Sequence, residues 1–250
     1  PEPIARFVRT ACRLAPGDRF ADAHAMRAAF AAALDEAEGR TPGAQRDPRF
    51  ADSWGVDVNR NYSVGSVFDG FVGGSTNCLS GTYAGSAEHS EAESSNVVDF
   101  AKAHSNIKFV MNVHSYGGYF MWPPGAYAVP GRITLPRPSP EETAQFQASA
   151  KRIVGAIASS RGTVTWPSRT GPVADVLYSA AGNSADELYY DLGIFAWDFE
   201  IGSDRWNPET NQWEGVGFQP PFPEAHAESQ EYADGLLELL RVARDYAGQG

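Results

Sequence analysis

The sequence is short of cysteine, of positive charge and of long apolar runs. Its two cysteines, Cys12 and Cys78, allow one disulfide at most, and spacing alone does not decide whether they pair. The 20 Lys and Arg against 31 Asp and Glu give a net charge of -11, whose field repels nucleic acids and anionic membrane surfaces. The Ala-rich stretch 21–37 is interrupted by charged residues, so no membrane-spanning segment is expected.

What is present is enough apolar sequence for a substantial core. The chain has 250 residues, 42% of them hydrophobic, and shows no break in composition between its halves, so we expect a single domain over residues 1–250. Residues 1–50 differ from the rest, with an Ala-rich amphipathic helix over 21–38 and a polar loop after it. We therefore read 1–50 as a divergent or truncated N-terminal part and 51–250 as the core.

The core alternates between strand and helix patterns. Strands are expected at 54–58, at 107–114, where apolar residues alternate, and at 193–202. Ser90 with Glu93 fits a capping box for one helix, and Ser139-Pro140-Glu141-Glu142 predicts the start of another that ends near Gly162. A last helix is expected at 227–246. Together these patterns predict an α/β fold whose sheet is covered by helices on both faces.

Two core strands carry polar residues near their carboxyl ends. His114 follows alternating apolar residues and precedes a Tyr-Gly-Gly turn, and Glu200 shares a strand face with Ala196 and Asp198. Strand ends are where α/β proteins place ligand-contacting residues, and a carboxylate on a core strand is costly unless it is paired or bound to a metal. A zinc hydrolase needs such a pair, with an imidazole on the metal and a carboxylate to accept a proton. A hydrogen-bonded core histidine and a buried salt bridge remain the alternatives.

Three stretches, "GVDVNRNY", "VMNVHSYGGYFMWPPG" and "VLYSAAGNSADELYYDLGIFAWDFEIG", make the chain similar to the zinc metallocarboxypeptidases of the carboxypeptidase A type, in particular to bacterial members. The resemblance is strong over residues 55–202 and fails before about residue 50. It implies an α/β fold with a mixed, mostly parallel sheet. It also implies a Zn²⁺ cofactor, peptide or protein C-termini as partners, secretion and a monomeric state.

The resemblance assigns roles to individual residues. His114 matches a zinc ligand and Glu200 the general base. Asn59 and Arg60 match the pair that grips the substrate's terminal carboxylate, which suits a guanidinium fork and an amide donor. Tyr178 matches the tyrosine whose hydroxyl closes over that carboxylate. Further substrate contacts are expected from the following residues: Ser115, Tyr116, Ala185 and Asp198. Without the motifs, Asn59 and Arg60 could be a turn asparagine beside a surface arginine, and Tyr178 a core tyrosine.

The chain departs from the family pattern in its metal ligands. The family's other two ligands come from a His-x-x-Glu motif, and none of the five histidines here is followed by Glu three residues later. We expect the first part of the domain to be missing from this sequence, so that the 250-residue chain alone holds no stoichiometric zinc and has no peptidase activity. The arginine that stabilises the oxyanion would be Arg40, Arg46 or Arg49.

Side-chain specificity follows from the pocket that the resemblance implies. Gly125, Val173, Ala185 and Asp198 would line it, and the carboxylate of Asp198 favours Lys or Arg at the substrate's C-terminus. Two other functions remain open: a peptidoglycan stem-peptide amidase of the same superfamily, and an inactive homologue that binds peptide ends without cutting them.

Overall fold

The computed structural model describes Ala29 and residues 55–129 and 131–248. The chain divides into two compact units, Pro1–Trp54 and Gly55–Gly250, and nearly all the described residues belong to the second. Apart from Ala29, the helix expected at 21–38 lies outside the described residues, as do Cys12 and the three candidate oxyanion arginines (Arg40, Arg46 and Arg49). The single-domain organisation of residues 1–250 stays a prediction.

A four-stranded sheet forms the centre of the second unit, in the order β1-β6-β2-β5. Strands β1 (Phe109–Ser115) and β6 (Phe195–Ile201) run parallel, as do β2 (Tyr119–Trp122) and β5 (Thr170–Pro172), while β2 and β6 are antiparallel. The expected mixed, mostly parallel sheet is therefore confirmed. Two small ribbons complete the strands: β3 (Tyr127–Ala128) with β4 (Ile133–Thr134), and β7 (Arg205–Asn207) with β8 (Gln212–Glu214).

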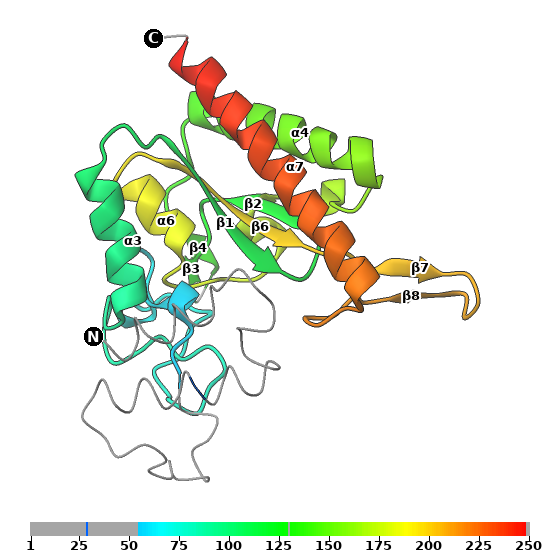
Figure 1. Cartoon of the computed structure of the whole chain (residues 1–250). Coiled ribbons are helices and arrows are strands. Elements are labelled where there is room, and N and C mark those ends of the chain that lie inside the picture. The colour runs from blue at the N-terminus through cyan, green and yellow to red at the C-terminus, as the bar shows by residue number, and fades with distance from the viewer. Residues whose placement is uncertain (1–28, 30–54, 130, 249–250) are drawn as a thin grey trace. The chain divides into compact units, whose positions relative to one another are not determined.

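Helices cover both faces of this sheet, as expected (Figure 1). Helices α4 (Pro140–Arg161) and α7 (Phe222–Ala247) pack together on one face, and α3 (Ala92–Ala103) and α6 (Ser184–Tyr190) lie on the other. The remaining helical segments are short: α5 (Val173–Val176) and the 3₁₀ turns η3 (Val58–Arg60), η4 (Val67–Asp69) and η5 (Pro167–Arg169). No helix in the described part of the chain is both long and apolar enough to cross a membrane.

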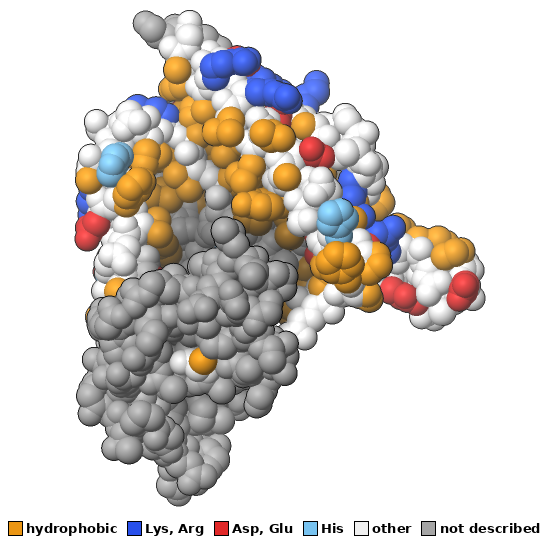
Figure 2. All heavy atoms as spheres, in the orientation of Figure 1, with side chains coloured by type: hydrophobic (Ala, Val, Ile, Leu, Met, Phe, Trp, Pro, Cys, Tyr) orange, Lys and Arg blue, Asp and Glu red, His pale blue; other side chains and the backbone are white. Residues whose placement is uncertain are grey.

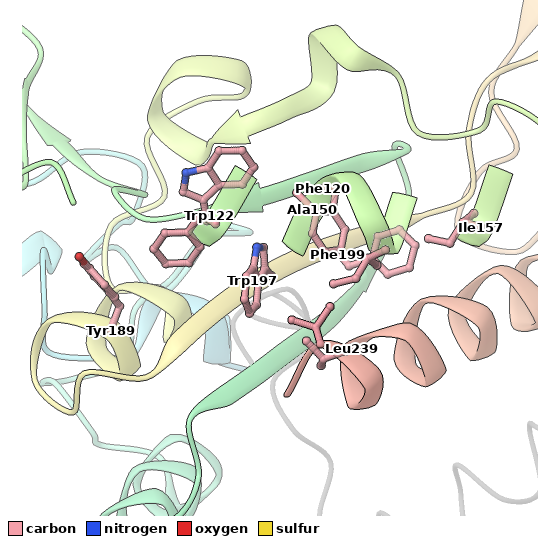
Figure 3. Close-up of a cluster of buried hydrophobic side chains, with 11 residues drawn as sticks. Phe120, Trp122, Ala150, Ile157, Tyr189, Trp197, Phe199 and Leu239 are labelled. Atoms are coloured by element: carbon pink, nitrogen blue, oxygen red, sulfur yellow. The ribbon is translucent and has the colours of Figure 1, made fainter. Parts of the chain in front are cut away.

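The main core lies between the sheet and the α4–α7 pair, and most of it is aromatic (Figure 3). Trp197 and Phe199 of β6 are fully buried there, and the Trp197 ring packs edge-on against Phe146 of α4 at 5.2 Å between centroids. Helix α4 is fixed at its start by the expected capping box, in which Ser139 and Glu142 bond each other's backbone N–H, and Gly162 is its C-cap. This face supplies a rigid support beneath the strands that carry His114 and Glu200.

Three local predictions were wrong. Residues 55–58 form no strand, because the side chain of Asp57 caps the 3₁₀ turn η3 instead. The capping box at Ser90 is absent, because the Ser90 hydroxyl accepts a hydrogen bond from the Asn61 side chain, and α3 starts at Ala92. The last helix begins at Phe222 rather than at about 227, and Pro221 is its N-cap.

Candidate active site

His114 and Glu200 lie side by side at the carboxyl ends of the two central strands. They are direct register partners in the parallel β1–β6 pair, so both side chains project from the same face. That face is the one opposite the aromatic core, because Trp197 and Phe199 alternate with Asp198 and Glu200 along β6. The alternation read from the sequence is therefore confirmed, and it places an imidazole beside a carboxylate.

Asn59 and Arg60 reach the same place from the turn η3. Asn59 is held by its carbonyl oxygen, which accepts hydrogen bonds from the backbone N–H of Ser184 at 3.0 Å and from the Asn112 side chain at 3.4 Å. Its amide nitrogen therefore points the other way and lies 3.5 Å from Nε2 of His114. This amide is presented to the cleft as a donor of fixed direction.

Arg60 is 7% exposed, and backbone carbonyls hold part of its guanidinium. Its Nε donates to Gly73 O and its Nη1 to Asn59 O, both at 2.7 Å, while the Asp57 carboxylate lies 3.8 Å from Nε. Five N–H groups are available on an arginine, so this arrangement fixes the plane of the fork and leaves further donors for a ligand. The geometry suits an arginine that reads a carboxylate.

These residues line one cleft of about 330 Å³. Tyr178 is 54% exposed and lies in the segment that follows α5, so its side chain is open to a ligand. Phe218 closes part of the wall and packs edge-on against Tyr116 at 5.0 Å. The other lining residues are Asp57, Asn59, Arg60, His114, Ser115, Met121, Val173, Leu177, Ala180, Asp198 and Glu200.

The charges at the floor of the cleft influence one another. Burial raises the pKa of Glu200; His114 and Arg60 oppose this rise, and the negative charge of Asp198 adds to it. Burial lowers the pKa of His114, but the Asp198 carboxylate, with Oδ1 3.5 Å from Nε2, and the charge of Glu200 outweigh burial, so this pKa is raised overall. A carboxyl group with a raised pKa is suited to accept and return a proton.

Not every predicted contact lies in the cleft. Val173 and Asp198 line it, whereas Tyr116, Ala185 and Gly125 do not, and Ala185 is buried in α6 with 1% exposure. Gly125 instead donates its backbone N–H to the fully buried carboxylate of Asp186 at 2.8 Å. Burial raises the pKa of Asp186 to about 7. The roles given to Ala185 and Gly125 remain predictions.

Sequence reasoning missed several residues that build the cleft. Asp57 and Asn112 orient Asn59, and both carried a signal, since Asp57 stands just before the Asn-Arg pair and Asn112 is polar within an apolar strand. Phe218 lies in a Gly- and Pro-rich loop before α7 and gave no signal. Its position depends on packing against Tyr116, which is 102 residues earlier in the chain by their numbers.

The described residues do not make a complete metal site. Among them no group of three or more His, Cys, Asp or Glu is arranged to hold a metal ion. His114 is the single residue predicted as a ligand, and its Nε2 already faces Asp198 and Asn59. Since a catalytic zinc site uses three protein ligands, the donors in the described part of the chain do not suffice for zinc.

Comparisons with known proteins identify a matching family and related chains. The family model of zinc carboxypeptidases matches residues 32–234. Rat carboxypeptidase A1 is 33% identical over 147 residues, which are 59% of this chain and 32% of that protein. Bovine carboxypeptidase B is 36% identical over 149 residues, again 59% and 32% of the two chains. Mouse carboxypeptidase A2 is 29% identical over 193 residues, covering 77% of this chain and 40% of the relative. The chain thus spans about a third to two fifths of these relatives.

Solved structures give the same fold. Bovine thrombin-activatable fibrinolysis inhibitor, in a complex with tick carboxypeptidase inhibitor, superposes with a TM-score of 0.60 at 24% identity, over 76% of this chain and 58% of that one. Carboxypeptidase A from Helicoverpa armigera gives a TM-score of 0.58 at 21% identity, over 86% and 49% of the two chains. At these identities the likeness concerns the fold.

Proposed function

This chain belongs to the zinc carboxypeptidase family, and we propose that its cleft binds the C-terminal residue of a peptide so that the last peptide bond is hydrolysed. One observation carries the proposal: Arg60, Asn59 and Tyr178 converge with Glu200 on a single cleft. An arginine that backbone carbonyls hold in one plane, beside an amide of fixed direction, selects a free carboxylate. The proposal includes secretion and a monomeric state.

Each residue has a defined task in this proposal. Arg60 and Asn59 bind the terminal carboxylate, and Tyr178, which is exposed in the absence of substrate, adds its hydroxyl. Glu200 accepts a proton from the attacking water and delivers it to the leaving amine, for which its raised pKa is suited. Val173, Met121 and Asp198 surround the side chain of the departing residue, and Asp198 gives this pocket a preference for Lys or Arg.

A binding experiment tests the proposal without requiring turnover. We expect the acetylated peptide Ala-Ala-Lys with a free C-terminus to bind at least about tenfold more tightly than its C-terminal amide, by titration calorimetry, because a charge-assisted pair is worth about 1.5–3 kcal/mol. Arg60→Met should abolish the difference. Arg137→Gln, which breaks an exposed ion pair with Asp175, is the matched control and should keep it. Equal binding of acid and amide by the unmodified protein would refute the proposal.

Binding without hydrolysis is a second candidate, and the incomplete set of metal ligands in the described residues favours it. The two candidates share the cleft and differ in the products. A peptide-release assay with added Zn²⁺ separates them, since the enzyme liberates free lysine from the same peptide while the binding protein retains it intact.

A further inference from the structure

The ribbon of β7 and β8 projects from the body of the protein and carries a pair of tryptophans (Figure 1). Trp206 and Trp213 are directly opposite each other, with 5.7 Å between ring centroids, and Trp166 packs edge-on against Trp213 at 5.8 Å. Even so, Trp206 is 47% and Trp213 57% exposed. Large aromatic surfaces left open to water in one place are typical of an interaction site.

Stabilisation of the ribbon accounts for only part of this arrangement. A two-stranded ribbon is marginal by itself, and an aromatic cross-strand pair contributes about 0.2–1 kcal/mol to it. The two rings meet edge to face, at 66° between their planes. About half of each tryptophan remains exposed, so the pair also offers aromatic surface to a partner.

The charges on the ribbon are mainly negative. Its segment carries Asp204, Glu209 and Glu214 against one cation, Arg205. Arg205 is paired with Glu224 of α7, and Asp204 is paired with Arg169, so Glu209 and Glu214 carry the free negative charge of the ribbon. Acidic side chains on the projecting ribbon are visible in Figure 2. Glu209 and Glu214 are both exposed. Tryptophan faces attract cations through their quadrupole, and nearby carboxylates strengthen that attraction, whereas polyanions are repelled. The ribbon is therefore suited to the ammonium of lysine or the guanidinium of arginine.

The ribbon is also continuous with the cleft. Gly215 follows β8 directly, and a Cβ atom at that position would lie 3.3 Å from the hydroxyl oxygen of Tyr116. Tyr116 in turn contacts Phe218, which lines the cleft. The segment that follows β8 thus runs beside Tyr116 to Phe218 in the wall of the cleft, which favours an extended polypeptide over an unrelated ligand.

We propose that the β7–β8 ribbon binds Lys and Arg side chains that precede the C-terminus of the polypeptide held in the cleft. The preferred ligand is then an extended basic chain, anchored at its end by Arg60 and further back by Trp206 and Trp213. This inference rests on the proposed function for the identity of the chain, while the cation site itself can be measured separately.

The test uses a peptide that cannot engage Arg60 through a carboxylate. An acetylated, C-terminally amidated decapeptide of alternating Gly and Lys is titrated while tryptophan fluorescence or heat is recorded. We expect Trp206→Ala and Trp213→Ala each to weaken binding about three- to fivefold, because an exposed cation–π contact is worth about 0.5–1 kcal/mol. Trp206→Phe, which keeps an aromatic cross-strand pair, should have a smaller effect. Phe100→Ala, at an aromatic that is 59% exposed on α3, should have none.

Two more measurements make the result specific. Glu209→Gln leaves the tryptophans in place and should weaken binding about twofold, with a smaller dependence on salt. The same decapeptide with Glu for Lys, and a neutral chitin hexasaccharide, should not bind. Unchanged affinity in both alanine variants, or binding of the acidic peptide or the sugar as tight as that of the Lys peptide, would overturn the inference. Loss of discrimination between peptide acid and amide would instead contradict the proposed function and leave the ribbon site standing.

Discussion

The two faces of β6 differ in chemistry although they belong to the same strand. Trp197 and Phe199 point to one face and are fully buried against α4 and α7. Ala196, Asp198 and Glu200 point to the other, where a small side chain is followed by two carboxylates. The aromatic face stabilises the fold, and the carboxylate face lines the cleft, where we propose that binding and proton transfer occur.

The contrast shows where the protein tolerates an unfavourable arrangement. Asp198 is 4% exposed, and within the described residues its Oδ1 has no hydrogen-bond partner of good geometry, only the ion-pair contact of 3.5 Å with Nε2 of His114. A buried carboxylate without a full set of partners costs free energy, and function is the usual reason that such a group is retained. The aromatic side chains packed on the other face of β6 contribute the stability that offsets this cost.

The largest expected effect concerns the carboxylate face. In any preparation that releases C-terminal residues, Glu200→Gln should lower turnover by about 10²–10⁴-fold, because a positioned acid–base group contributes this much. Peptide binding should change little, since the amide has nearly the same shape. Rates are compared with those of Glu141→Gln, at an exposed carboxylate in the first turn of α4. Normal turnover in the Glu200 variant would remove the residue from the mechanism.

On the aromatic face the matching change affects folding. Trp197→Ala should lower the free energy of unfolding by about 3–5 kcal/mol, because it opens a cavity among Phe120, Phe146 and Phe199. Urea titration followed by circular dichroism measures the loss. Trp213→Ala, at an exposed tryptophan, should cost no more than about 1 kcal/mol. If Trp197→Ala and Trp213→Ala lowered the free energy of unfolding by similar amounts, the aromatic face of β6 would not be the main source of stability.

Asp198 tests whether the carboxylate face also selects substrates. We expect Asp198→Asn to weaken binding of peptides that end in Lys or Arg by about three- to tenfold, with little change for peptides that end in Leu. The reason is the loss of a negative charge from the cleft wall without a change in side-chain shape. If the unmodified protein already binds Leu- or Phe-ended peptides far more tightly, the basic preference is wrong.

The sequence was informative where a period or a short motif fixes the local structure. Alternation along β1 and β6 placed His114 and Glu200 correctly, and the Ser-Pro-Glu-Glu motif gave the start of α4. It was misleading at 54–58 and at Ser90, where an Asp side chain and a distant Asn side chain take part in hydrogen bonds that no local pattern reveals. The position of Phe218 and the hydrogen bond from the Ser184 backbone N–H to the Asn59 side chain depend on contacts between segments far apart in the chain, so single-sequence reasoning could not have found them.

The smallest effect concerns carboxylates at the margin of the aromatic face. Burial raises the pKa of Glu228 on α7, and the charges of Glu224 and Glu231 add to it. Below the ordinary glutamate pKa of 4.5 the group is protonated in both the folded and unfolded states. As the pH rises through the raised pKa, the folded protein has to bury a charge, so native stability falls. Glu228→Gln avoids this cost.

The stability of Glu228→Gln relative to the unmodified protein should therefore increase with pH, by about 1 kcal/mol or less between pH 4 and pH 8.

Glu238→Gln on the same helix is the matched control of opposite sign. Burial tends to raise the pKa of Glu238, but its bonds to Arg152 and Arg241 outweigh burial and lower it. Its carboxylate thus stabilises the fold above pH 4.5, and this contribution is lost as the pH falls through the lowered pKa. At neutral pH, the melting temperature of the Glu228 variant should therefore be higher than that of the unmodified protein, and that of the Glu238 variant should be lower. Parallel profiles for the two variants would show that the Glu228 carboxylate is as well paired as that of Glu238.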